Sequence, residues 1–265
     1  MACSRGLIMA PLAAGFLAVG AFASARQGGD TIRVSGQVLV EGGGPIAGAS
    51  LRTDALRGAM SAPFGGQREF TARSNESGDW SLLGITRGLW ILEVSAPQYL
   101  PHVLVVPISM MLKPEPGPWE TSLALLPVAA IAPPDMPKDA PERFILQAID
   151  QLQSDKKAAR QTLQKLTGAS LNAGGLVAAG DIALLLREPG MARRFFELAA
   201  TAEPKWYRPQ LGVASAAMMS NDIDRAMKAY AAARDNTNNK KLEVMLSNTI
   251  KDLQQIRGRD LELAR

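Results

Sequence analysis

The sequence is poor in the residues that most often carry chemistry, with one cysteine, Cys3, and one histidine, His102. Cys3 lies close to the N-terminus, so the rest of the chain has no disulfide and no thiolate ligand for a metal. A single imidazole cannot build a histidine-based zinc site, and no Gly-x-Ser-x-Gly nucleophile motif is present. We expect His102 to be a surface residue without a catalytic role. The sequence predicts a non-enzymatic protein with no cofactor and no metal site.

Charge is also limited, at 20% of residues with a net value of +4. Two short basic pairs, Lys156-Lys157 and Arg193-Arg194, lack the interleaved aromatic residues of a nucleic-acid surface, so no nucleic-acid partner is expected. The glycines at 42–44 are not followed by Gly-Lys-Ser/Thr, which excludes a phosphate loop. The turn at 75–79 lacks the acidic spacing of a calcium loop.

The first 25 residues have the layout of a secretory signal peptide. Arg5 is followed by an apolar stretch and then by Ala23-Ser24-Ala25, which predicts cleavage before Arg26. The alternative is a retained membrane anchor, but the proline and glycines within the apolar stretch favour removal. We therefore expect an exported bacterial protein, periplasmic or extracellular, with no membrane segment after processing.

Residues 26–131 show the two-residue alternation of β-strands, separated by glycine and proline turns. About seven such runs predict an antiparallel β-sandwich. Within the runs the large apolar residues fall on every second position, so we expect them to form the core of the sandwich: Trp80, Leu82, Trp90, Leu92 and Val94.

The ordered glycines and apolar residues of this half resemble the bacterial carboxypeptidase regulatory-like domain. The matching positions are Gly36, Gly44, Pro45, Ile46, Gly48, Ala49, Gly78, Trp80, Leu82, Gly84, Ile85, Gly88, Trp90, Leu92, Val94 and Tyr99. The resemblance implies a small sandwich of transthyretin-like (prealbumin-like) topology. Two departures are a long connection at 54–67 and Gln98, where the family often has glycine.

Four prolines within residues 132–142 predict a linker, beyond which the pattern becomes helical. Alanines recur at 158, 192 and 226, and aromatic residues at 196 and 230, with a period of 34. Residues 143–265 therefore resemble tetratricopeptide repeats, in which helical hairpins stack. The final segment predicts a capping helix with one apolar face: Leu242, Met245, Leu246, Thr249, Leu253 and Ile256. The predicted fold class is α+β, with a β-sandwich domain and a helical-repeat domain, each with its own core.

The resemblance to tetratricopeptide repeats implies a concave groove for a partner peptide. The candidate groove residues are Asp181, Arg208, Ser215 and Met218. The favoured hypothesis is an exported scaffold that binds a protein or peptide partner of the envelope. The alternative for the repeats is that they only pack against the sandwich. The alternative for function is a carbohydrate-binding accessory protein, with Trp119 as the glycan-stacking residue.

Overall fold

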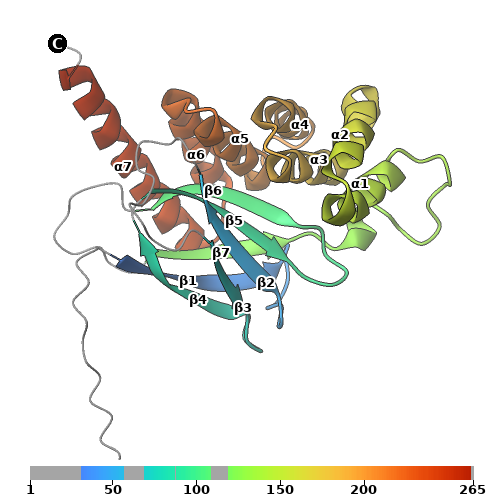
Figure 1. Ribbon diagram of the computed structural model, residues 1–265, viewed down its shortest axis with the longest axis horizontal. Coiled ribbons are helices and arrows are strands. Elements are labelled where there is room, and N and C mark those ends of the chain that lie inside the picture. The colour runs from blue at the N-terminus through green and yellow to red at the C-terminus, as the bar shows by residue number, and fades with distance from the viewer. Residues whose placement is uncertain (1–30, 57–68, 87, 109–118, 264–265) are drawn as a thin grey trace, which may run out of the picture.

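The computed structural model describes residues 31–56, 69–86, 88–108 and 119–263. The predicted signal peptide and most of the long connection at 54–67 lie outside these ranges. The described part is α+β, with strands in the N-terminal half and helices in the C-terminal half (Figure 1). None of its helices combines the length and the apolar composition needed to cross a bilayer.

The strands form two sheets (Figure 1). The three-stranded sheet has the order β4 (Asp79–Thr86), β1 (Thr31–Val40), β7 (Trp119–Leu125). The four-stranded sheet has the order β3 (Glu69–Arg73), β2 (Ser50–Ala55), β5 (Gly88–Ser95), β6 (His102–Ile108). The expectation of a purely antiparallel arrangement is wrong at β7, which runs parallel to β1.

The alternation of the strands places the predicted core side chains inside. Trp80, Leu82, Trp90, Leu92 and Val94 are all buried, as their spacing predicted. The indole nitrogen of Trp90 donates a hydrogen bond to the Thr86 carbonyl at 2.9 Å, which satisfies its polar group in the interior.

Glycine is required in β1 because its neighbour β7 approaches closely. A Cβ atom on Gly36 would lie 2.0 Å from the carbonyl oxygen of Thr121, its partner in β7. No other residue type fits between these strands without moving them.

The helices form antiparallel hairpins with a repeat of constant length. The helix α3 begins at Ala173 and α5 at Tyr207, while α4 begins at Pro189 and α6 at Ile223, so both pairs of starts are 34 residues apart. This confirms the spacing predicted from the alanines and aromatics. The elements of this half are α1 (Glu142–Ser154), α2 (Lys156–Lys165), α3 (Ala173–Leu185), α4 (Pro189–Ala202), α5 (Tyr207–Met219), α6 (Ile223–Asn236) and α7 (Lys240–Leu263), with short 3-10 turns η1 (Val128–Ala130) and η2 (Leu166–Gly168).

Small residues let successive helices approach one another around Phe196. Its ring occupies the space that a side chain on Gly180 or Gly212 would need, because a Cβ atom there would lie 2.6 Å or 2.3 Å, respectively, from the nearest ring atom. Phe196 of α4 is thereby clamped between α3 and α5. The predicted apolar face of α7 is also confirmed, since all six of its residues are buried.

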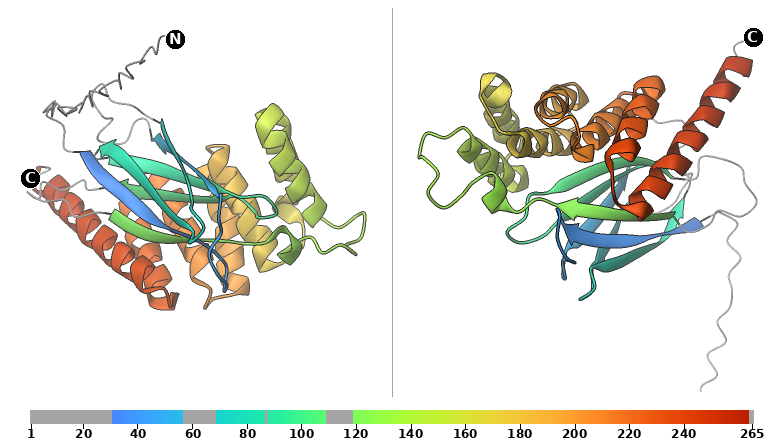
Figure 2. Two further views of the ribbon diagram at one scale, coloured as in Figure 1. Left: turned by 90° about the horizontal axis from the view of Figure 1, so that it is seen from below. Right: turned by 180° about the vertical axis from the view of Figure 1, so that it is seen from behind.

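The helices pack directly on the edge of the sheets. In Figures 1 and 2, α5 lies over β6 and α7 runs beside β7. The buried apolar residues form one continuous cluster from the strands into the helices. Residues 132–141 join the two halves without a helix or a strand. The expectation that each half has its own core is wrong, because the apolar interiors of the two halves are in contact. The division into two domains at this linker stays a prediction.

Candidate functional site

The four predicted groove residues lie on α3 and α5, where Asp181, Arg208 and Ser215 contact strands of the chain's own sheets. Asp181, Arg208, Ser215 and Met218 are all buried, with exposed fractions between 0% and 6%. The resemblance to tetratricopeptide repeats implied that these positions line an inward-facing surface for a partner peptide. What occupies that surface is strand β6.

Side chains from the helices bind the free edge of β6. Asp181 Oδ1 accepts a hydrogen bond from the Val103 amide at 3.2 Å, and Ser215 Oγ accepts one from the Val105 amide at 3.1 Å. The hydroxyl of Tyr230 donates to the Val105 carbonyl at 2.6 Å. Because β6 pairs with β5 on its other side only, these backbone groups would otherwise form an unpaired sheet edge. The helical half therefore satisfies and covers that edge.

A buried charged network continues from this edge. The Arg208 guanidinium lies 3.1 Å from Asp181 Oδ2 and donates to the Ala124 carbonyl of β7 at 2.6 Å. Glu41 lies 3.9 Å from the same guanidinium and accepts hydrogen bonds from the Trp206 indole and the Tyr207 hydroxyl. Arg208 of α5 thus joins the three-stranded sheet to α3, and its charge is balanced by two carboxylates.

The expectation that His102 is a surface residue is wrong. Its exposed fraction is 4%, because α3 and α5 cover the start of β6. The Nδ1 atom is 3.5 Å from Asp181 Oδ2 and has no hydrogen-bond partner among the described residues. Burial lowers the pKa of His102, and the positive charge of Arg208 lowers it further, although Asp181 acts in the opposite direction. The neutral imidazole is the favoured form inside the protein.

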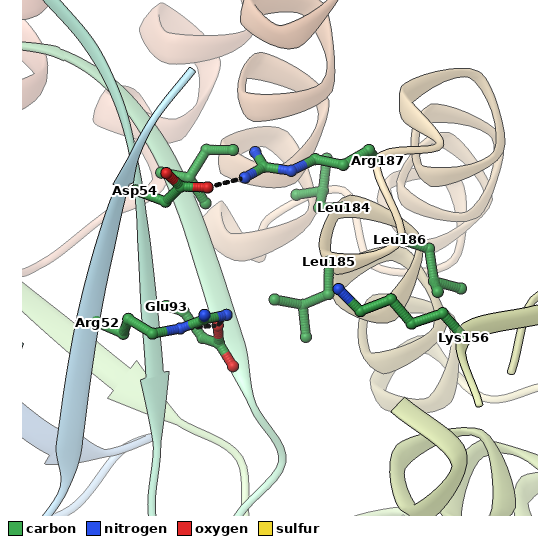
Figure 3. Close-up of a pocket in the computed structure, with 9 residues that line it drawn as sticks. Arg52, Asp54, Glu93, Lys156, Leu184, Leu185, Leu186 and Arg187 are labelled. Carbon is green, nitrogen blue, oxygen red and sulfur yellow. Dashed lines mark hydrogen bonds and ion pairs between the residues drawn. The ribbon is translucent and has the colours of Figure 1, made fainter. Parts of the chain in front are cut away.

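An open cleft lies beside this interface, between the outer face of β2 and β5 and the end of α3 (Figure 3). Its volume is about 190 Å³. We call it the charged cleft, and its lining residues are Arg52, Asp54, Ile91, Glu93, Lys156, Leu184, Leu185, Leu186 and Arg187.

Two ion pairs line the charged cleft, one from the helices to the sheet and one between the adjacent strands β2 and β5. Arg187 Nη2 lies 2.6 Å from Asp54 Oδ2, and Arg52 Nη2 lies 2.6 Å from Glu93 Oε2. The hydrogen bond from Arg52 to Glu93 raises the pKa of Arg52, whereas partial burial lowers the pKa of Arg187. The pair Arg187–Asp54 connects the helices to the sheet, and Figure 3 shows Arg187 extending across the opening.

A second hollow continues from the charged cleft along the outer face of β3, β2 and β5. Its volume is about 490 Å³, and it shares Arg52 and Glu93 with the charged cleft. We call it the sheet-face hollow, and its lining residues are Ser50, Leu51, Arg52, Thr71, Ala72, Arg73, Glu93 and Ser95. The two hollows together form a polar surface that the helices leave uncovered.

Sequence reasoning missed the charged cleft, because its residues come from separate segments of the chain. One local signal was present in the sequence, the residue type at position 187. Arg187 follows the end of α3, and the equivalent position after α5, one repeat later, is Asn221. Both have a positive φ, 61° for Arg187 and 57° for Asn221. Asparagine or glycine is the usual residue in this conformation, so an arginine there is unusual.

Trp119, the predicted glycan-stacking residue, is the first residue of β7 and not part of a loop. Its side chain lies outside the described part of the structure, so a glycan-binding role stays a prediction. Over the described ranges no group of three or more His, Cys, Asp or Glu side chains is placed to hold a metal ion.

Comparison with known proteins gives distant structural similarity alone. No protein-family model matches the sequence, and no curated protein matches it. PcrH, from Pseudomonas aeruginosa, in complex with the chaperone binding region of PopD, has a TM-score of 0.37 and 17% identity, covering 49% of this chain and 99% of PcrH. The Yersinia enterocolitica type III secretion chaperone SycD, in complex with a peptide of the translocator YopD, has a TM-score of 0.39 and 16% identity, covering 46% of this chain and 98% of SycD.

Another similar structure is the hydroxyquinol 1,2-dioxygenase from Pseudomonas putida DLL-E4, with a TM-score of 0.27 and 13% identity. The similarity covers 37% of this chain and 57% of the dioxygenase. With identities and TM-scores this low, none of these similarities assigns a family or a function to this chain.

Proposed function

We propose that this chain is an exported, non-enzymatic interaction protein that binds a protein or peptide partner in the charged cleft and the sheet-face hollow. The observation that carries the proposal is the occupancy of the inner helical face. Asp181 and Ser215 bind β6, so a partner at the predicted groove residues would have to displace a strand of the sheet. The charged cleft and the sheet-face hollow need no such rearrangement.

The chemistry of the charged cleft favours recognition over catalysis. Its two carboxylates, Asp54 and Glu93, each accept a hydrogen bond from an arginine. A general base needs a carboxylate free to take up a proton from a substrate. Fixed ion pairs instead present donors and acceptors in set positions, which suits the binding of a polar segment.

We also infer that the two halves are a carboxypeptidase regulatory-like sandwich and tetratricopeptide-like repeats. Support for the first comes from Gly78 and Gln98, whose φ angles of 77° and 68° suit the glycine positions of that family. Support for the second comes from the 34-residue repeat of helix starts.

Export is part of the same proposal, and the predicted cleavage site makes it testable. Mass spectrometry of the protein isolated from the envelope fraction should give an N-terminus at Arg26. A chain that retains Met1 would contradict export by cleavage.

Site-specific photo-crosslinking tests the binding surface. A photoreactive amino acid at Thr71, in the wall of the sheet-face hollow, should give a saturable adduct with the partner in cells that export the full chain. The matched control is Lys228, which is exposed on α6, away from both hollows. The added variant Ser95→Trp, which fills the sheet-face hollow, should abolish the Thr71 adduct. Equal adducts from both positions, or an adduct that survives Ser95→Trp, would overturn the proposal.

A further inference from the structure

The charged cleft also indicates the chemistry of its ligand, an inference that rests on the proposed function. We infer that the charged cleft and the sheet-face hollow bind an acidic peptide segment of the partner, with Arg187 and Lys156 as the principal contacts for its carboxylates. Three observations lead to this assignment: the backbone at Arg187, the charge of the lining and the extent of the surface.

The helix end accounts for the positive φ at position 187 but not for the choice of arginine there. After α3, the amide of Glu188 donates to the Ala183 carbonyl, and after α5 the amide of Asp222 donates to the Ala217 carbonyl, both at 2.9 Å. The two helix ends therefore have the same motif. At position 221 the residue with the positive φ is asparagine, which tolerates this conformation. Arginine at 187 adds strain without improving the motif. What it adds is a guanidinium at the mouth of the cleft.

The lining of the two hollows carries excess positive charge. It contains four cationic side chains, Arg52, Arg73, Lys156 and Arg187, and two carboxylates, Asp54 and Glu93. Both carboxylates are paired with arginines, whereas Lys156 and Arg73 make no ion pair with any described residue. Figure 3 shows the ammonium group of Lys156 reaching into the charged cleft beside Leu185. An incoming carboxylate would meet free donors there, whereas an incoming cation would meet carboxylates that are already paired.

The shape of the surface favours a peptide over a small carboxylate. The charged cleft is floored by apolar side chains of α3, and the sheet-face hollow continues past Arg52 across β2 and β3. The two ends of this combined surface each carry a cationic group, Lys156 on α2 and Arg73 on β3. Because these groups lie on different elements, one small anion cannot contact both. An extended segment with carboxylates at several positions can.

The test is fluorescence anisotropy with the full mature chain, residues 26–265, and labelled peptides of alternating Glu and Ala. Arg187→Asn introduces the residue that the equivalent helix end has at position 221, so the helix end should be preserved. This variant should weaken peptide binding about tenfold or more, the loss typical of a charge-assisted hydrogen bond. Lys156→Gln should weaken it several-fold. The matched control is Lys157→Gln, an exposed neighbour that does not line the cleft, which should bind as the wild type does.

Three outcomes would overturn the inference. They are equal binding of a peptide with Gln in place of Glu, equal loss in Lys157→Gln, and binding of free glutamate as tightly as the peptide. Circular dichroism melting of Arg187→Asn, expected to match the wild type within a few degrees, separates loss of binding from loss of folding. If the Thr71 adduct with the partner saturates in Arg187→Asn at the same concentration as in the wild type, the proposed function stands and the acidic-peptide assignment fails.

Discussion

Among single residues, the polar side chains on the inner helix faces serve folding. Arg208 is 1% exposed and contacts Asp181, Glu41 and the Ala124 carbonyl. A buried ion pair of this kind adds little stability over apolar residues of the same shape, but breaking it leaves one charge unpaired in the interior. The consequence is that these residues hold the two halves together in one arrangement.

Arg208→Met should therefore lower the free energy of unfolding by about 3–5 kcal/mol, because Asp181 and Glu41 lose their cation. Urea denaturation followed by circular dichroism measures this difference. The double variant Arg208→Met with Asp181→Leu should recover part of the loss, since it removes one of the unpaired charges. A single variant within about 0.5 kcal/mol of the wild type would show that Arg208 does not stabilise the interface.

His102 predicts a dependence of stability on pH. Its folded-state pKa is lowered by burial and by Arg208, so between that value and the unfolded pKa of about 6.5 the unfolded chain binds more protons. Stability should then fall as the pH drops below about 6.5 and be unaffected by this group above that pH. Urea unfolding of wild type and His102→Gln at several pH values tests the sign. The slope between about pH 6.5 and 5.5 should be shallower in His102→Gln, and an unchanged slope would contradict the assignment.

Among helices and strands, close approach decides where glycine is needed. Phe196 fills the space beside Gly180 and Gly212, whereas a Cβ on Gly190 of α4 would meet no atom within 4 Å. The same residue type therefore has opposite roles in neighbouring helices. Alanine has the better helix propensity at both kinds of position, and only packing separates them.

Gly212→Ala should destabilise the protein by about 1–3 kcal/mol, because its methyl group would enter the ring of Phe196. Gly190→Ala is the matched control and should be neutral or stabilising by up to about 1 kcal/mol. Thermal unfolding of the two variants beside the wild type gives both values. The packing argument fails if the two substitutions change the unfolding temperature in the same direction.

In the molecule as a whole, the helices and sheets share one continuous apolar cluster. The free edge of β6 is satisfied by Asp181, Ser215 and Tyr230. Neither half is complete without the other, since the sheet half alone would expose this edge and the fully buried Val103 and Val105.

Two results follow for residues 26–265 and for the N-terminal part alone. The full chain should unfold in one cooperative transition, with coincident curves from near-ultraviolet circular dichroism and from the far-ultraviolet helical signal. Residues 26–137 alone should self-associate, as measured by size-exclusion chromatography with light scattering. A monomeric, folded N-terminal fragment would show that the edge of β6 needs no cover.

Local patterns predicted some features of this fold and missed others. Alternation predicted the buried residues of β4 and β5, and the 34-residue period predicted the helix starts, because both depend on contacts repeated along neighbouring segments. The parallel pairing of β7 with β1 and the burial of His102 could not be read from the sequence, since each depends on a strand or helix distant in the chain.

The candidate site divides in the same way. The resemblance of the sequence to tetratricopeptide repeats implied that Asp181, Arg208 and Ser215 face inward on successive helices, and helical geometry sets the direction in which each side chain points. It took the folded arrangement to put β6 against those faces and to bring Arg187, Arg52 and Lys156 together in an open cleft. The partner of a side chain is whichever group the fold brings within reach, and for Ser215 that group is the amide of Val105, 110 residues earlier in the chain. No pattern confined to neighbouring residues carries that information.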